Sequence, residues 1–391
     1  MITLEDALNI ILNNVQTNAV ENIPIENCVN RVLSDDIFSD INMPPFDKSA
    51  VDGYACKKED LNKVLQVTEV VAAGKIPSKK VTNGTCVKVM TGAKIPEGAE
   101  LVVMVEYVEI IDKQTVKFIT SKTSKNICFK SEDIKAGSLV LSKGALLRPY
   151  HAGILATVGT TSVPVYKKVK VGIIVTGDEI IEPQNTLPDG KIFNSNAYQL
   201  INSCLSVDVI PDYFGIVEDD YEAICNSINI MLEKTDVVLI TGGVSVGDFD
   251  YVPAAMKSVG LEIKFDSIAM QPGRPLTYAT KGNKHCFGLP GNPVSTFVQF
   301  ELSIKPLLYK IMGHDYKPLT ISLKLSETIT RKEAKRKSFY PVRLNSDNTI
   351  SPVSYHGSAH INSYAEAFGI ISMDIGVFEI NKGAEVYVRQ I

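Results

Sequence analysis

The sequence predicts a multidomain protein that combines a doubly wound α/β domain with separate β modules. Three observations support this: strands, loops and amphipathic helices repeat over residues 168–316, short alternating strands fill residues 57–142, and short strands return from about residue 317. The chain of 391 residues is long enough for about two to four domains. We therefore expect an N-terminal helical region (residues 1–56 and 143–167), an inserted β domain (57–142), an α/β domain (168–316) and a small C-terminal β-barrel-like domain (317–391).

The N-terminal half mixes helical and strand patterns. Residues 3–20 place apolar side chains on one helical face, and a short helix from His151 to Val158 is expected to pack back on it. Between these helices, alternating runs separated by turns such as Asn83-Gly84 predict an all-β module. Its expected strands are residues 85–90, 101–105 and 115–119.

The α/β half alternates strands and helices, which implies a parallel sheet covered on both faces. In such a sheet, ligands collect at the carboxyl ends of the strands. Acidic residues favour the start of a helix, because they interact well with the helix dipole. The expected strands are residues 169–175, 207–210 and 236–240, and the expected helices run from Asn194-Ser195 to Cys204, from Asp219-Asp220 onward, and from Asn292-Pro293 to about Ile311.

Composition excludes several classes of protein. Hydrophobic content of 45%, charge of 21% and a net charge of −4 are ordinary for a soluble globular protein. We expect no membrane helix, no signal peptide and no nucleic-acid binding, since the one dense basic run is residues 331–337. Seven scattered cysteines without a CxxC pair, and five unclustered histidines, argue against zinc and favour buried free thiols in a reducing cytoplasm.

A glycine-rich loop, residues 241–251 (TGGVSVGDFDY), follows one of the expected strands. Its glycines allow a tight turn and close approach to a ligand, and its amide N–H groups suit an oxyanion. Because Asp248 and Asp250 would repel a phosphate, the loop predicts a magnesium-assisted site for a phosphorylated ligand. The simpler alternative is a tight connection, since the loop has no common nucleotide signature. The candidate ligand contacts are Gly242, Gly243, Ser245, Gly247 and Asp248.

Four other loops should converge with this one on the same edge of the sheet. Glu179, Asp219 and Asp250 would then supply hard oxygen ligands for Mg²⁺ or acceptors for a polar ring. Arg274 would face an oxyanion, and Ser295 in the first helical turn would donate to an anion. The further candidate contacts are Thr176, Gly177, Asp178, Pro272, Gly273, Pro290, Gly291, Asn292 and Pro293.

Each of these residues also has a simpler structural explanation. Asp219 would then only cap its helix, and Glu179 would be a surface charge in a turn. Pro290 and Pro293 would only shape the start of the final helix.

Five motifs together give the chain a resemblance to the MoeA family of molybdopterin molybdenumtransferases, which includes the E domains of gephyrin and of the plant molybdenum-cofactor protein. In family order they span nearly the whole chain, and the first and the glycine-rich loop are highly specific in combination. They are residues 44–55 (PPFDKSAVDGYA), 90–93 (MTGA), 176–179 (TGDE), 241–251 and 288–295 (GLPGNPVS).

The resemblance implies an elongated homodimer whose N-terminal helical region forms the dimer contact, with an α/β domain that binds molybdopterin. The implied reaction takes adenylyl-molybdopterin and molybdate as substrates, hydrolyses the adenylate with Mg²⁺, inserts molybdenum and releases AMP. The implied partners include the adenylyltransferase of the same pathway.

By motif, the resemblance implies that Asp52 and Thr91 act catalytically across the dimer, together with the acidic residues of the α/β domain. Of these, Glu179 and Asp250 would be the metal ligands or lie beside the pyrophosphate, and Asp219 would contact the pterin. A turn residue before Gly53 is the simpler explanation for Asp52. In the C-terminal module, the resemblance carries over Arg336, Ser358 and Ser363.

The sequence departs from the family pattern on the molybdate-binding side. Ser267 and Gln271 stand where two basic residues are usual, and Lys264 or Lys281 would have to lie nearby to replace them. In the C-terminal module, Pro341 and His360 stand where arginine is common in the family, and Phe368 stands where asparagine is usual.

Two alternatives to the insertion enzyme remain at this point. One is a molybdopterin adenylyltransferase, which shares the α/β domain but lacks the long N-terminal half. The other is a non-catalytic molybdopterin-binding or scaffold paralogue, for which Ser267 and Gln271 are the argument.

Overall fold

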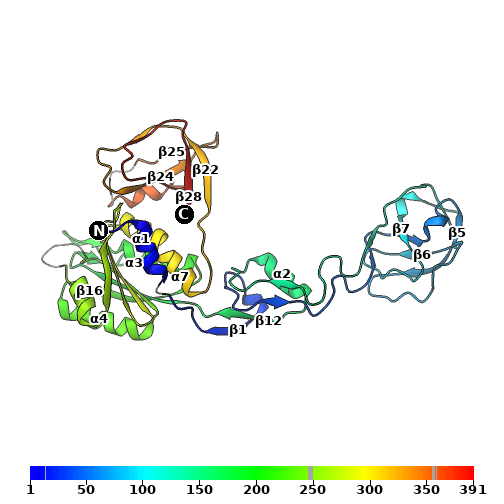
Figure 1. Cartoon of the computed structure of the whole chain (residues 1–391), viewed down its shortest axis with the longest axis horizontal. Helices are drawn as coiled ribbons and strands as arrows, with labels where there is room; N and C mark the ends of the chain where they lie inside the picture. The colour runs from blue at the N-terminus through cyan, green and yellow to red at the C-terminus, as the bar shows by residue number, and fades with distance from the viewer. Residues whose placement is uncertain (14, 245–249, 355–356, 358) are drawn as a thin grey trace.

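The computed structural model describes residues 1–13, 15–244, 250–354, 357 and 359–391, and the molecule is elongated (Figure 1). The α/β domain and the C-terminal β domain lie together at one end. A small waist, residues 20–38 and 139–166, separates them from a distal β domain, residues 48–128, at the other end (Figure 1). Within the described ranges, no helix has the length and apolar character needed to cross a membrane.

A six-stranded sheet forms the centre of the α/β domain. Its first four strands run parallel, as predicted, and the fifth runs antiparallel to both of its neighbours, so the sheet is mixed. In spatial order the strands are β16 (Ile210–Val217), β13 (Lys170–Thr176), β17 (Val237–Thr241), β21 (Lys284–Leu289), β20 (Pro275–Lys281) and β18 (Glu262–Ser267).

Helices cover both faces of this sheet, which confirms the doubly wound prediction. Successive residues of β13 point to opposite faces: Ile173 joins one apolar core and Ile174 joins the other. The first core includes α3 (Ser195–Ser206), α6 (Pro293–Gln299) and α7 (Lys305–Ile311), and the second includes α4 (Tyr221–Lys234) and α5 (Val252–Ser258).

Two helix starts agree with the prediction, and one strand start does not. The side chains of Asn194 and Asp220 cap α3 and α4 by accepting hydrogen bonds from backbone N–H groups. The strand predicted at residues 207–210 begins only at Ile210. Asp208 has a φ of 58°, a left-handed conformation that ends the turn after α3 before the chain becomes extended.

The predicted final helix is continuous but contains a wider π turn, η4 (Phe300–Ile304), between α6 and α7. Pro306 follows directly. It has no N–H to donate to Leu302, and its ring would clash with that carbonyl in a regular α-helix, so a wider turn accommodates it.

The helix predicted over residues 3–20 is shorter in the structure: α1 spans Leu4–Asn13, and it packs in the α/β domain rather than in the waist. Its buried face, Leu4, Ala7 and Ile11, joins the core that contains α7. The expectation that the second short helix packs back on it is therefore wrong: α2 (Pro149–Thr157) packs on the 3₁₀ turn η1 (Ile25–Asn27).

The waist is built from two small antiparallel pairs around α2 and η1. Its core is a small apolar cluster that includes Leu33, Leu147 and Leu155. The strand pairs are β1 (Val20–Pro24) with β12 (Ser162–Tyr166), and β2 (Ile37–Phe38) with β11 (Leu139–Leu141).

The distal domain is all β, as predicted, and its sheet begins before residue 57, because the strand at 53–56 is a central member. Apolar clusters lie on both faces of the sheet. Its strands, in spatial order, are β7 (Leu101–Met104), β4 (Gly53–Cys56), β6 (Thr85–Val89), β5 (Val64–Val71), β9 (Thr115–Phe118) and β8 (Val108–Ile110), with 3₁₀ turns η2 (Lys58–Asp60) and η3 (Val105–Tyr107) and the short pair β3 (Lys48–Ser49) and β10 (Ile127–Cys128).

The C-terminal domain is a small closed barrel, as predicted, because β24 pairs with both β25 and β26. The barrel also pairs with β19 (Met270–Gln271) of the α/β domain through β24, and this pairing joins the two domains. The other elements are β22 (Thr320–Leu325), β23 (Ile329–Thr330), β24 (Lys337–Leu344), β25 (Thr349–Pro352), η5 (Ile361–Tyr364), β26 (Gly369–Met373), β27 (Glu379–Ile380) and β28 (Glu385–Gln390).

All seven cysteines are free, and six of them are buried, in agreement with the sequence-based expectation of buried thiols. Burial raises the pKa of the Cys204 thiol to about 12, so this group stays protonated at neutral pH.

The placement of α1 predicts the effect of truncating its buried face. Ile11→Ala should destabilise the α/β domain by about 2–5 kcal/mol, because it removes a fully buried side chain from a close-packed core. Urea denaturation followed by circular dichroism measures the effect. The exposed neighbour Asn9 provides the control, since Asn9→Ala should leave the transition nearly unchanged; equal effects of the two changes would contradict this packing.

Candidate functional site

Four parallel strands end side by side and bring their loops to one edge of the sheet. Thr176 lies beside Val217 on one side, and the neighbouring register places Thr241 beside Val175 and Leu289. The loops that follow these strands therefore open on the same edge, as the sequence predicts. The loop before β20 reaches the same edge, because β20 runs antiparallel to β21.

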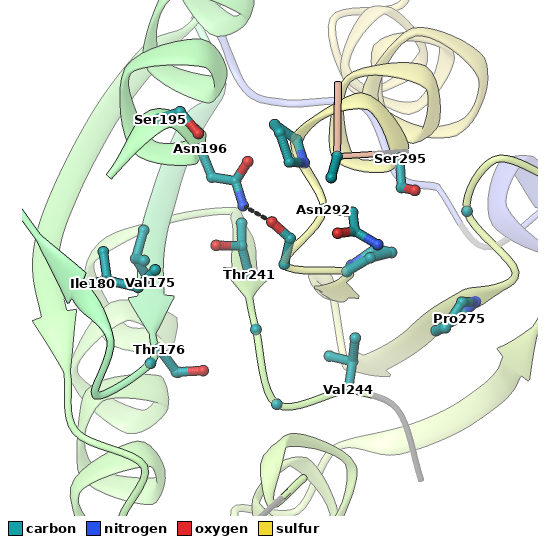
Figure 2. Close-up of a pocket in the computed structure, with 18 of the residues that line it drawn as sticks. Val175, Thr176, Ile180, Ser195, Asn196, Thr241, Val244, Pro275, Asn292 and Ser295 are labelled. Atoms are coloured by element: carbon teal, nitrogen blue, oxygen red, sulfur yellow. Dashed lines mark hydrogen bonds between the residues drawn. The ribbon is translucent and has the colours of Figure 1, made fainter. Parts of the chain in front are cut away.

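A cavity of about 1060 Å³ lies at this edge, between the α/β domain and the C-terminal domain. Figure 2 shows Thr176 and Thr241 on one side of the cavity and Asn292, Ser295 and Pro275 on the other. Both domains contribute to its wall. The predicted residues that line it are Thr176, Gly177, Glu179, Asp219, Gly242, Gly243, Asp250, Pro272, Gly273, Arg274, Pro290, Gly291, Asn292, Pro293, Ser295 and Arg336.

Backbone from the glycine-rich loop passes very close to β13 at Gly242. Its φ is +96°, and a Cβ at this position would lie 2.4 Å from the carbonyl oxygen of Thr176. Only glycine fits such an approach. The Thr176 hydroxyl is buried beside this loop and faces the Asp219 carboxylate, because its interaction with that group lowers the pKa of Asp219.

Carboxylates form one wall of the cavity. Glu179, Asp219 and Asp250 line it, and one carboxylate oxygen of Asp219 is buried without a hydrogen-bond partner among the described residues. Burial raises the pKa of Asp219, and the neighbouring charges of Asp178 and Glu179 raise it further. This wall would therefore be stabilised by a cation or by a hydrogen-bond donor.

Two arginines, Arg274 and Arg336, are the cationic side chains that line this cavity in the described ranges. Neither of the lysines considered as replacements lies there. Lys264 pairs with Glu262 at 2.7 Å, and Lys281 donates to the carbonyl of Val259 at 2.8 Å, so both are held elsewhere by the antiparallel strands that carry them.

The backbone at Arg336 is held by another arginine. The Arg331 guanidinium donates to the carbonyl of Arg336 at 2.7 Å, to the Ser338 hydroxyl at 2.7 Å, and to the carbonyls of Val377 and Asp374. The backbone of Arg336, directly before β24, is therefore held in place.

Some predicted residues lie outside the cavity. Asp178 lines an adjacent hollow of about 710 Å³, and its carboxylate accepts a hydrogen bond from the backbone N–H of Asp219. Ser363 lines a separate hollow in the C-terminal domain and donates to the carbonyl of His360 at 2.7 Å. The predicted contacts that fall outside the described residues are Ser245, Gly247, Asp248 and Ser358.

Asp52 and Thr91 lie together on the distal domain, far along the molecule from this cavity (Figure 1). One Asp52 oxygen accepts hydrogen bonds from the Thr91 backbone N–H at 2.6 Å and from its hydroxyl at 2.8 Å. These bonds, from the backbone first, lower the pKa of Asp52, which therefore stays ionised. The two residues form a pair, as the motifs suggest, but within one chain they do not join the other acidic residues.

Sequence reasoning missed several residues of the wall. Asn196 is buried and donates to the carbonyl of Gly291 at 2.8 Å, which ties α3 to the loop before α6 (Figure 2). Ile192 and Phe193 are exposed apolar residues at the mouth of the cavity. The cap at Asn194 marks the start of α3, but only the fold shows that its first turn faces the cavity.

The raised pKa of Asp219 predicts how its replacement affects stability. The pKa of Asp219 is higher in the folded protein than its usual value of 3.8. The free energy of unfolding therefore falls as the pH rises from about 3.8 through the folded-state pKa. Asp219→Asn should therefore raise the thermal midpoint slightly at pH 7, and the gain should disappear below pH 4. Differential scanning calorimetry across this range tests it, with the helix-capping Asp220→Asn as the matched control; a loss of stability in Asp219→Asn at pH 7 would contradict it.

Family models match three consecutive parts of the chain. They are the MoeA N-terminal region (domains I and II) at residues 2–159, a probable molybdopterin binding domain at 172–310, and the MoeA C-terminal region (domain IV) at 323–391.

Relatives and solved structures agree with these matches. A molybdopterin molybdenumtransferase of Staphylococcus aureus is 35% identical over 84% of this chain and 81% of its own length. The protein of the same name from Haemophilus influenzae is 32% identical over 100% of this chain and 98% of its own. A crystal structure of the molybdopterin biosynthesis MoeA protein from Pyrococcus horikoshii OT3 matches with a TM-score of 0.87 and 30% identity over 100% of both chains. The chain therefore belongs to the MoeA family of molybdopterin molybdenumtransferases.

Proposed function

We propose that this protein is the enzyme of molybdenum cofactor biosynthesis that inserts molybdenum from molybdate into adenylyl-molybdopterin and releases AMP. The observation that carries the proposal is a single cavity with a carboxylate wall and a separate arginine wall, in a chain of this family. The reaction needs both, because it joins an inorganic oxyanion to a substrate that carries a phosphoanhydride.

The carboxylate wall fits a magnesium ion. Its oxygen donors are the hard ligands that Mg²⁺ prefers, and burial, followed by the neighbouring charges of Asp178 and Glu179, raises the pKa of Asp219. In the described ranges, no three acidic, histidine or cysteine residues lie close enough to hold a metal by themselves. Magnesium usually takes only one or two carboxylates, here Glu179 and Asp250, and completes its shell with phosphate and water. When bound there, the ion would neutralise and polarise the phosphoanhydride.

The protein's own groups orient the organic substrate. Ile192 and Phe193 offer apolar contact for a planar ring, and the unpartnered oxygen of Asp219 offers an acceptor for ring N–H donors. Thr176 presents its hydroxyl at the closest approach of the glycine-rich loop. On the opposite wall, Arg274 and Arg336 bind the molybdate oxygens and hold the anion beside the dithiolene.

We further propose that the enzyme acts as a homodimer, with Asp52 and Thr91 completing the cavity of the other subunit. Two features support a second copy at the waist. The sequence of α2 (PYHAGILAT) has an apolar character around the helix, yet Leu155 is its one buried residue. In addition, Val20, Phe38 and Tyr150 are exposed to 53%, 54% and 66%.

A cytoplasmic enzyme suits the buried free thiols, which persist in a reducing compartment. We also propose that the adenylyltransferase that makes the substrate delivers it to this enzyme, because the phosphoanhydride of adenylyl-molybdopterin is reactive and its dithiolene is not yet protected by a metal.

Release of AMP from adenylyl-molybdopterin by the purified protein tests the proposal. With Mg²⁺ present, release should rise with molybdate and saturate, and chelation of magnesium should reduce it by about 10²-fold or more. Asp250→Ala should cause a comparable loss without changing thermal stability markedly. If the adenylate binds but stays intact at every molybdate concentration, the protein is a pterin-binding or scaffold paralogue instead. Net formation of the adenylate from ATP would indicate an adenylyltransferase.

Mixing two inactive variants tests the shared site. Asp52→Ala and Asp250→Ala should each be inactive, but a mixed dimer contains one cavity in which both residues are intact. Co-refolding equal amounts should restore about a quarter of wild-type activity, because half of the random dimers are mixed and each has one working site. A mixture of Asp250→Ala with Glu179→Ala is the control: both changes fall on the same domain, so activity should not return. No recovery in the first mixture, with mixed dimers demonstrated by mass spectrometry, would overturn the proposal that Asp52 completes the cavity of the other subunit.

A further inference from the structure

Three successive carbonyl groups, those of Gly273, Arg274 and Pro275, attach the loop that carries Arg274 to the rest of the α/β domain. This loop is the segment QPGRP, residues 271–275, and two of its five residues are prolines without an N–H. The Arg274 carbonyl accepts a hydrogen bond from the backbone N–H of Ile268 at 3.0 Å. The carbonyls on either side, of Gly273 and Pro275, need other donors because they are enclosed by the domain.

Gln299 supplies both of these donors from the last residue of α6. Its side-chain Nε2 donates to the Gly273 carbonyl at 2.8 Å and to the Pro275 carbonyl at 2.7 Å. The side chain is 0% exposed, and its own oxygen has no partner within the described structure. The loop packs directly on this amide: at Gly273, with a φ of +94°, an added Cβ would lie 2.9 Å from Nε2.

The amide bridges the residues on both sides of Arg274 and leaves Arg274 itself exposed at the cavity. A glutamine amide has two N–H donors, and both are used here. Turning the amide over would place its oxygen against two carbonyl oxygens, so its orientation is set by the loop. The exposed guanidinium is thereby attached to a backbone that is fixed at three successive carbonyls.

We propose that Gln299 is the positioning residue for Arg274 and, through it, sets the affinity of the cavity for molybdate. The inference rests on the proposed function, since it assigns Arg274 to the anion. Gln299 itself does not line the cavity. Its role matters more in this chain because Ser267 and Gln271 bring no charge to the anion wall, which leaves Arg274 and Arg336 as its cations among the described residues.

Gln299→Met tests this role, because methionine keeps the approximate volume and shape but has no donor. The KM for molybdate should rise about tenfold while kcat changes by less than about twofold, the pattern of weakened anion binding. Gln299→Asn keeps an amide on a shorter stem that reaches at most one carbonyl, so it should give a smaller rise and provides a milder second variant. Ser303→Ala, at another buried polar group of the same long helix, is the matched control and should leave the molybdate KM unchanged.

A double-mutant cycle separates positioning from a general loss of structure. In an Arg274→Ala background, Gln299→Met should have almost no further effect on molybdate affinity, because the group that it positions is absent. Equilibrium dialysis with molybdate alone measures this affinity without turnover. A tenfold loss that persists in the Arg274→Ala background, or unchanged affinity in Gln299→Met, would overturn the positioning role.

The same dialysis distinguishes the two proposals. If wild-type protein does not bind molybdate, the proposed anion wall fails and this inference fails with it. If the wild type binds molybdate and Arg274→Ala weakens binding while Gln299→Met does not, only the role of Gln299 is overturned.

Discussion

The parallel register of β16, β13, β17 and β21 is the constraint on which the rest of the site depends. Hydrogen bonds between these strands place their carboxyl ends in line, so loops that are distant in sequence open at one edge. The close approach of Gly242 to Thr176 is a direct consequence, because it requires two neighbouring strands to end at the same level.

The two walls of the cavity have opposite charge because different parts of the fold supply them. Carboxylates come from the ends of the parallel strands, whereas the arginines come from the loop before the antiparallel strand β20 and from the C-terminal barrel. Pairing of β19 with β24 joins these last two segments. Neither arginine is among the groups that shift the pKa of Asp219, which is raised first by burial and then by the charges of Asp178 and Glu179. The cavity can therefore bind a substrate that needs a cation beside the carboxylates and an oxyanion beside the arginines.

The elongated shape follows from the position of the N-terminal helix α1. Because α1 is buried in the α/β domain, the chain must leave that domain, cross the waist, form the distal sheet and return before β13. This path gives the distal domain its distance from the cavity in the same chain (Figure 1). It also leaves the waist with a small core and exposed apolar side chains. Exposed apolar patches of this kind are typical of interaction surfaces.

The sequence by itself determined the local elements and the family, because periodicity, caps and motifs depend on residues close together in the chain. The caps at Asn194 and Asp220 and the glycine-rich loop are of this kind. It placed the start of β16 too early, since the left-handed turn at Asp208 has no strong local signal. Only the tertiary structure decided which charges meet. Lys264 and Lys281 lie near Arg274 in sequence but on the wrong parts of their strands, whereas Arg336 arrives from another domain. The sequence also did not reveal the hydrogen bonds from Gln299 to the carbonyls on either side of Arg274. They depend on the packing of α6 against Gly273 and Pro275, which lie 26 and 24 residues before Gln299.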